Sequence, residues 1–216
     1  MPLSLLEECA ARNLPVVQTY GLTEAASQVT TLAPGDALRK LGSAGKPLLP
    51  TEVEIAGARH PMAVGEIGEI LVRGPTVSPG YVGEHEPPTD AEGWLHTGDV
   101  GRFDEEAFLH VLGRRDDVIV SGGENVHPVE VEAVLQSHPA VSEVCVVGAP
   151  DPEWGAAVVA FVRLREGNTA TEVQLREHAR RQLAGFKLPR RIIFVEDFPR
   201  TAAAKIARQE LQQRLA

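Results

Sequence analysis

The stretch GRRDDVIVSGGEN, residues Gly113–Asn125, divides the chain into two parts of different sequence character. It holds four charges at 114–117, then the apolar run Val118–Val120 and the pair Gly122–Gly123. An apolar run before two glycines predicts a short buried strand that ends in a tight turn. Because the charged run can stay solvated at a domain boundary, we expect one domain over residues 1–115 and another over 116–216.

The residues before this stretch predict an N-terminal segment and a β-rich subdomain. Apolar residues at helical spacing indicate a helix over 3–12, and LPVVQTYG (14–21) indicates a buried strand ending at Gly21. From 42 to 112, short runs of β-formers lie between Gly and Pro, as in TEVEIAG (51–57) and GEIGEILVRG (65–74). This pattern predicts an all-β subdomain, with a small barrel as one form of it.

The residues after the stretch alternate between helical and strand patterns. Helices are expected over 127–139 with Pro128 in the first turn, over 171–186 with a Thr171–Gln174 capping box and an end near Gly185, and over 204–216. Strands are expected over 141–150, 157–164 and 191–199. The second domain is therefore predicted to be α+β, and the whole chain to combine α/β and α+β architecture.

Composition excludes several classes of protein. The chain has 216 residues, 43% of them hydrophobic, and a formal net charge of -9. Nucleic-acid binding needs clustered Lys and Arg, and a membrane span needs about 20 consecutive apolar residues, so neither is expected. Cys9 and Cys145 have no metal or redox spacing, and Glu7 and Glu8 interrupt any signal peptide. We expect a cytoplasmic, soluble protein, and a homo-oligomer stays open.

The motif YGLTE (20–24) offers groups suited to a nucleotide. Tyr20 presents a flat face for a base, and Gly21 lets the next backbone approach a ligand. Thr23 and Glu24 pair a hydroxyl with a carboxylate, which suits a phosphate oxygen and Mg²⁺. The alternative is a simple helix N-cap at Thr23.

Three further residues are candidates for ligand contacts. In GWLHTGDVG (93–101), the Asp99 carboxylate can accept two ribose hydroxyls, although an Asx turn is the alternative. Arg114 can bind a second ribose or phosphate oxygen, unless it forms only a surface ion pair with Asp116 or Asp117. In FPRTAAAKIARQEL (198–211), Lys205 lies among small residues at an expected helix start, where an anion is favoured and where a solvated lysine is the alternative.

Together and in this order, the motifs resemble the adenylate-forming superfamily of acyl-CoA synthetases, peptide adenylation domains and luciferases. The resemblance covers essentially the whole chain and is strongest in YGLTEAASQ, GWLHTGDVGRFDEEAFLHVLGRRDDVIVSGGENVHPVEVE and PRTAAAKI. Residues 20–50 look most like the o-succinylbenzoate–CoA ligases of menaquinone biosynthesis, and 122–144 also resemble aryl-CoA ligases. The implied reaction joins a carboxylic acid to ATP as an acyl-adenylate, then transfers the acyl group to coenzyme A. ATP or AMP, Mg²⁺ and CoA are the implied cofactors.

The resemblance implies a role for each motif residue. Tyr20 would stack on adenine, Thr23 would touch the α-phosphate, Glu24 would hold Mg²⁺, and Asp99 and Arg114 would bind ribose. Lys205 would bridge the carboxylate and the α-phosphate, so Lys205 and Thr23 are the catalytic candidates. Asp116 would be the hinge about which a C-terminal lid domain rotates. The implied CoA contacts are Gly122, Gly123, Trp154, Phe186, Lys187 and Arg190, and the implied acyl-pocket residues are Ser27 and Gln28.

Two departures from the family pattern matter. The family usually has Gly before its catalytic lysine, where this chain has Ala204. Family enzymes are also about twice as long, and this sequence lacks the Gly-rich loop that would cradle the β- and γ-phosphates. The chain therefore looks like the C-terminal half of a ligase, with the missing N-terminal half as its partner, and is expected to have little activity alone. Another aryl- or acyl-CoA ligase, or a non-catalytic nucleotide- or CoA-binding or complementing module, are the alternatives.

Overall fold

The computed structural model describes residues 3–57, 62–83 and 88–215. The chain divides into two units, Leu3–Asp116 and Asp117–Ala216, and the division lies one residue after the boundary predicted from the sequence. Each unit has its own hydrophobic clusters, and each is described by itself below.

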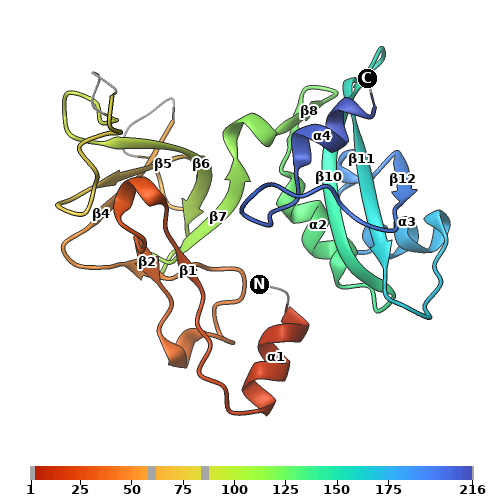
Figure 1. The fold of residues 1–216 in the computed structure, drawn as a ribbon, viewed down its shortest axis with the longest axis horizontal. Coiled ribbons are helices and arrows are strands. Elements are labelled where there is room, and N and C mark those ends of the chain that lie inside the picture. Colours follow the sequence, from red (N-terminus) through yellow and green to blue (C-terminus); the bar gives the residue numbers. More distant parts are fainter. Residues whose placement is uncertain (1–2, 58–61, 84–87, 216) are drawn as a thin grey trace. The chain divides into compact units, whose positions relative to one another are not determined.

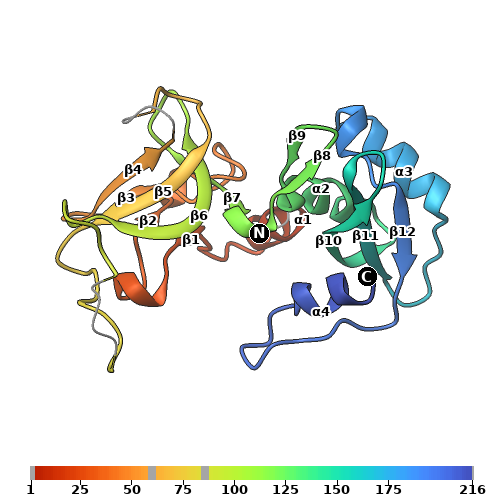
Figure 2. The ribbon, with the colours of Figure 1, turned by 90° about the horizontal axis from the view of Figure 1, so that it is seen from above.

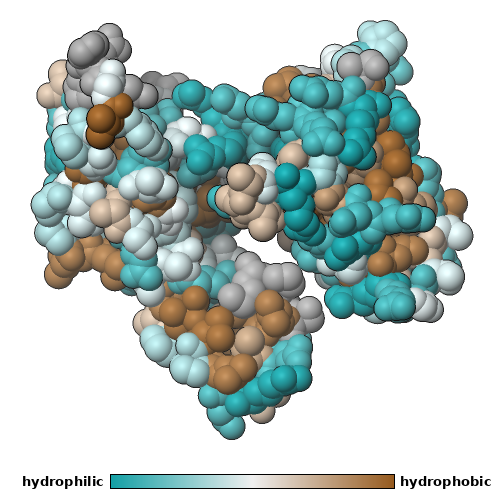
Figure 3. All heavy atoms as spheres, viewed as in Figure 1, coloured by the Kyte–Doolittle hydropathy of each residue, from teal (hydrophilic) through white to brown (hydrophobic). Residues whose placement is uncertain are grey.

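The first unit begins with helix α1 (Leu3–Ala11) and a small antiparallel sheet of β1 (Thr19–Tyr20), β2 (Thr30–Thr31) and β3 (Lys46–Pro47). The prediction of a buried strand over 14–21 is wrong, because only its last two residues before Gly21 pair with another strand. Pro15 cannot donate a ladder hydrogen bond, and Leu14 is 51% exposed. Figure 3 shows apolar surface around α1, and Leu5 on this helix is 45% exposed.

The β-rich subdomain is an open antiparallel sheet in the order β4-β5-β6-β7, not a closed barrel. Its strands are β4 (Glu52–Ala56), β5 (Gly68–Arg73), β6 (Leu95–Phe103) and β7 (Leu109–Arg114). One face packs against the turn after Tyr20, where buried Ala25 and Val29 meet Ile70 and Val72. Two short 3₁₀ helices, η1 (Thr23–Ala25) and η2 (Pro34–Asp36), complete this unit up to the 3₁₀ turn η3 (Arg115–Asp117).

The second unit opens with a hairpin, which forms at the predicted Gly122–Gly123 turn. Strand β8 (Ile119–Ser121) pairs with β9 (Glu124–Val126), and Gly122 and Gly123 form the two-residue loop. Their φ angles of 60° and 85° lie in the left-handed region, as a type I′ hairpin turn requires. Ile119 is 3% exposed in the core, whereas Val120 is 54% exposed, so one side of β8 anchors the hairpin.

The main sheet of the second unit has the order β10-β11-β12, with β11 and β12 parallel. Its strands are β10 (Val141–Asp151), β11 (Gly155–Leu164) and β12 (Arg191–Phe194). Helices α2 (Pro128–Gln136) and α3 (Glu172–Arg180) cover one face, and α4 (Arg208–Gln213) covers the other (Figures 1 and 2). Along β10, Val144 and Val146 pack with the first cluster and Cys145 and Val147 with the second, as strand alternation requires.

The helix signals were accurate at the starts of α2 and α3 and less accurate at their ends, since α2 was predicted to reach residue 139 and ends at Gln136. Pro128 begins α2, and the capping box at Thr171 and Gln174 forms both of its reciprocal bonds. Helix α3 ends at Arg180, before Gly185, which begins the 3₁₀ turn η4 (Gly185–Lys187). Within the described ranges, no helix is long and apolar enough to cross a bilayer.

The prediction that Lys205 lies at the start of a helix is wrong. Helix α4 begins at Arg208, three residues later. Ile206 forms an isolated β-bridge with Arg200, and Ala204 has a φ of +59°, so neither residue can belong to a right-handed helix. Lys205 therefore lies in a hairpin turn.

Candidate functional site

Three residues that are far apart in the sequence meet through one carboxylate in the first unit. The Tyr20 hydroxyl donates to Asp99 Oδ2 at 2.7 Å, and Arg114 Nε lies 2.9 Å from Asp99 Oδ1. Asp99 and Arg114 are direct cross-strand partners on β6 and β7. Both carboxylate oxygens are thus engaged by side chains instead of forming the Asx turn considered as an alternative. Arg114 likewise pairs with Asp99 and not with its charged sequence neighbours.

The backbone before Asp99 is held by a set of local bonds. The Thr97 hydroxyl donates to the Ile70 carbonyl at 2.7 Å and accepts from the Asp99 N–H at 3.1 Å. Gly98 has a φ of +69°, where a side chain would be strained, and its N–H donates to Glu69 Oε1 at 3.0 Å. The Asp99 carboxylate is therefore presented by a preorganised strand.

The Tyr20 phenol is held in its neutral form. Burial is the largest cause that raises the pKa of Tyr20, and the adjacent Asp99 carboxylate raises it further. The hydroxyl stays a hydrogen-bond donor to Asp99 at physiological pH, which fixes the orientation of the ring.

The turn after Tyr20 shows a steric reason for glycine at position 21 that the sequence did not predict. A Cβ on Gly21 would lie 1.5 Å from the Ser27 carbonyl oxygen, so the turn itself already requires glycine at this position. Leu22, not Thr23, is the N-cap of η1, and it makes no side-chain cap, so the N-cap alternative for Thr23 is also wrong. Thr23 is exposed at the first position of η1, and Ser27 and Gln28, predicted for the acyl pocket, are exposed at the end of the same turn.

Glu24, the predicted Mg²⁺ ligand, has its carboxylate held in the ionised form. Its Oε1 accepts a hydrogen bond from the Tyr81 hydroxyl at 2.5 Å, which is the main cause that lowers the pKa of Glu24. Among residues 3–57, 62–83 and 88–215, no cluster of three His, Cys, Asp or Glu could hold a metal by itself. Mg²⁺ is commonly bound by one or two carboxylates plus substrate phosphates, and one ionised carboxylate suits that arrangement.

Lys205 is exposed in the hairpin of the second unit. The Thr201 N–H donates to the Lys205 carbonyl at 2.8 Å, and the Ala204 N–H donates to the Thr201 carbonyl at 2.9 Å. The left-handed φ of Ala204 gives the physical reason why glycine would be favoured at that position.

Several predicted CoA contacts gather around one pocket of about 420 Å³ in the second unit. Trp154, Phe186 and Arg190 line it, and the Arg190 guanidinium carbon lies 4.8 Å from the centre of the Trp154 ring. Gly122 lies beneath the same ring, since a Cβ there would be 2.5 Å from a Trp154 carbon. Gly123, by contrast, has open space where a side chain would project.

Sequence reasoning missed Ser121, Arg176 and Arg180 in this pocket. The two arginines are one turn apart on α3, and that i, i+4 spacing in a strongly basic stretch was the available signal. Lys187 does not line the pocket, because its amine is bonded to both oxygens of Glu130 at 2.7 Å.

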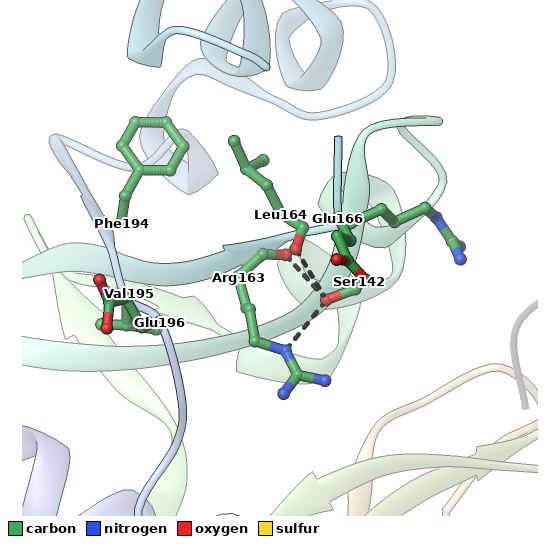
Figure 4. Close-up of a pocket in the computed structure, with 8 residues that line it drawn as sticks. Ser142, Arg163, Leu164, Glu166, Phe194, Val195 and Glu196 are labelled. Atoms are coloured by element: carbon green, nitrogen blue, oxygen red, sulfur yellow. Dashed lines mark hydrogen bonds between the residues drawn. The ribbon is translucent and has the colours of Figure 1, made fainter. Parts of the chain in front are cut away.

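A larger hollow of about 610 Å³ holds none of the predicted residues (Figure 4). It lies where β11 and β12 end, beside Ser142, Arg163 and Phe194. Its polar groups largely satisfy one another, since Arg163 Nε donates to the Ser142 hydroxyl at 3.1 Å. The hollow therefore offers a poorer ligand site than the Trp154 pocket.

Asp116, the predicted hinge, is the last residue of the first unit. Its side chain is 94% exposed, and Arg115 Nε lies 3.8 Å from its carboxylate. Its backbone lies in the 3₁₀ turn η3, and its role as a hinge stays a prediction.

Two family models match the chain. One describes AMP-binding enzymes and matches residues 1–82, and the other describes the C-terminal domain of AMP-binding enzymes and matches residues 130–205. The 2-succinylbenzoate–CoA ligase of Geobacillus kaustophilus is 52% identical over 98% of this chain, and that of Listeria monocytogenes serotype 4b is 47% identical.

Solved structures agree with these matches. The o-succinylbenzoate CoA synthetase of Bacillus subtilis, in complex with the acyl-adenylate intermediate, is 43% identical with a TM-score of 0.90. The alignment covers 98% of this chain and 44% of that one. The chain spans less than half the length of these relatives, with 44% of the Geobacillus protein covered.

Proposed function

Since this chain belongs to the adenylate-forming AMP-binding enzymes, we propose that it is the C-terminal part of an acid–CoA ligase. The complete ligase would form an acyl-adenylate from a carboxylic acid and ATP, and then an acyl-CoA thioester. The observation that carries the proposal is the convergence of Tyr20 and Arg114 on the Asp99 carboxylate.

The proposed nucleotide site uses groups that the fold already orients. Asp99 would accept the ribose hydroxyls, with Arg114 beside it as a second contact. The Tyr20 ring, fixed by its hydroxyl, would stack on adenine. Thr23 and Glu24 follow within one turn, so Thr23 would contact the α-phosphate and Glu24 would hold Mg²⁺. The bound metal would supply charge neutralisation to the phosphates.

Lys205 would act in the first half-reaction. Its ammonium would stabilise the oxygens of the acid and the α-phosphate as negative charge develops, and a single donor of this kind contributes about 3–4 kcal/mol in other enzymes. Rotation about Asp116 would then withdraw Lys205 for the second half-reaction. The Arg200–Ile206 hairpin supports this role, because it presents Lys205 on a defined turn.

The Trp154 pocket would receive coenzyme A. Arg190 stacks on Trp154, and Arg180 lies in the same pocket, so two guanidinium groups are available for phosphates. Gly123 would leave room for the pantetheine arm, Gly122 would let the Trp154 ring lie close to the turn, and Phe186 would flank the arm. Lys187, the remaining implied CoA contact, has its amine in an ion pair with Glu130.

The proposed acid is o-succinylbenzoate, on the path to menaquinone. Support comes from the relatives reported above, each of which is named for that substrate. Ser27 and Gln28 would border the acyl pocket, whose remaining walls would come from the N-terminal part of the ligase.

The test is complementation in the test tube. The region of the Geobacillus ligase that lies before the matched segment would be supplied as a separate chain, and pyrophosphate release would be followed with ATP and a panel of acids. We expect release only when both chains are present, and fastest release with o-succinylbenzoate. Binding of AMP and CoA by the mixture without pyrophosphate release would instead favour a non-catalytic module.

A further inference from the structure

We propose that Arg208 is a positioning residue that ties the hairpin carrying Lys205 to Asp117, the residue after the proposed hinge position. This inference rests on the proposed function and deepens it, because it names the connection that would make Lys205 follow any rotation at Asp116.

The Arg208 guanidinium joins three separate elements. Its Nε lies 3.2 Å from Asp117 Oδ2 in η3, and its Nη1 lies 2.8 Å from Glu132 Oε1 on α2. The same Nη1 donates to the Val146 carbonyl on β10. Glu132 Oε1 also accepts the Val146 N–H at 2.8 Å, so the carboxylate is itself fixed. With 24% of its side chain exposed, Arg208 is largely withdrawn from water, unlike an ordinary surface pair.

Arg208 lies immediately beside the Lys205 hairpin. It is the first residue of α4 and lies two residues after Ile206, which closes the hairpin by its bridge to Arg200. The Ala207 N–H donates to the Pro199 carbonyl at 2.8 Å, across the base of the same hairpin. Because only Ile206 and Ala207 separate Arg208 from Lys205, a displacement of the Arg208 backbone would also move Lys205.

A second arginine holds the other arm of the hairpin. Arg200 Nη2 bonds both oxygens of Glu143 at 2.9 Å, and its Nη1 donates to the Ala204 carbonyl at 3.2 Å. The two arms are thus fixed to the sheet independently, but only Arg208 also reaches Asp117.

The helix itself cannot supply this rigidity. Helix α4 has six residues, which is too short to be stable without tertiary contacts. Leu211 is fully buried against the sheet and anchors its middle, while the Arg208 contacts anchor its start. The ion pairs are therefore placed where fraying would otherwise disorder the Lys205 hairpin.

The experiment compares Asp117→Asn with Asp116→Asn in the full chain by amide hydrogen exchange. Asp116 is the matched control because it is adjacent, exposed and not bonded to Arg208. We expect Asp117→Asn to speed exchange of the Thr201 and Ala204 amides about tenfold, with the amides of α3 unchanged. Asp116→Asn should change neither set.

A second pair of variants tests whether the Arg208 guanidinium is required. Arg208→Gln should speed hydrogen exchange of the Thr201 and Ala204 amides more than Asp117→Asn does. Arg214→Gln, at the C-terminal end of the same helix and in an exposed pair with Glu210, should leave their exchange unchanged. If Arg208→Gln does not fold, the Asp117 and Asp116 variants decide alone.

Unchanged exchange rates of the Thr201 and Ala204 amides in Asp117→Asn would overturn the proposal. An equal rise throughout the second unit would also overturn it, because the contact would then stabilise the unit without linking the hairpin to Asp117. Exchange involves no catalysis, so this result is independent of whether Lys205 proves to act on a nucleotide.

Discussion

The Tyr20–Asp99 hydrogen bond can be tested by a double-mutant cycle. Tyr20→Phe removes the hydroxyl that donates to Asp99 at 2.7 Å and leaves the ring in place. A hydrogen bond to a charged group contributes about 1.5–3 kcal/mol, and Asp99 is only 8% exposed. The Arg114 side chain is 59% exposed, so its bond to the other oxygen contributes about 0.2–1 kcal/mol and compensates little.

We therefore expect Tyr20→Phe to destabilise the first unit by about 1–2 kcal/mol, with a coupling of similar size to Asp99→Asn. Because the chain has two units, the free energy of opening should be measured by native-state exchange of the β5 and β6 amides and not from one melting curve. Tyr81→Phe, which removes an exposed hydroxyl, is the control. A coupling below about 0.3 kcal/mol, the limit of additivity for independent sites, would refute the claim of a preorganised ribose site.

Three further predictions concern single groups. The pKa of Tyr20 is raised in the folded chain above its ordinary value of 10.0, so above about pH 10 the unfolded chain loses a proton that the folded chain keeps. The stability of the first unit should therefore fall as pH rises above about 10. A Tyr20→Phe variant that shows the same fall would contradict this. Burial raises the pKa of the Cys145 thiol to about 12, so a thiol reagent should modify partly exposed Cys9 first and Cys145 only as the second unit opens; equal rates would count against the buried position. Gly122→Ala should destabilise the second unit and alter Trp154 fluorescence, whereas Gly123→Ala should cost only the strain of its positive φ, roughly 1 kcal/mol, and identical behaviour of the two variants would contradict the packing of Trp154 on Gly122.

Local sequence signals predicted the second unit well. The runs that became β10 and β11 are rich in β-formers, and the Thr171–Gln174 capping box and Pro128 mark helix starts through interactions within one turn. The Gly122–Gly123 turn was predicted for the same reason, since two adjacent positive φ angles favour glycine at both positions.

The misses arose where long-range contacts override local pattern. Residues 14–18 have apolar character but form no ladder, because the two-residue strand β1 finds its partner only at Thr19 and Tyr20. Lys205 looked helical from its small neighbours, yet the bridge between Arg200 and Ile206 holds that segment as a hairpin.

The sequence indicated which residues form the candidate site but not the hydrogen bonds and ion pairs among them. Motif order suggested Tyr20 and Asp99 for one nucleotide, but no local pattern links a hydroxyl to a carboxylate 79 residues away. The role of Gly21 against Ser27, the pairing of Lys187 with Glu130 and the two α3 arginines in the Trp154 pocket also depend on tertiary packing.

The most direct test of the proposed function separates the two half-reactions in the complemented ligase. Lys205→Ala should slow acyl-adenylate formation by about 10²–10³-fold, the loss typical of one transition-state donor, while thioester formation from preformed acyl-adenylate stays within a few-fold of the unaltered protein. Equal losses in both half-reactions, or no loss in the first, would contradict the account.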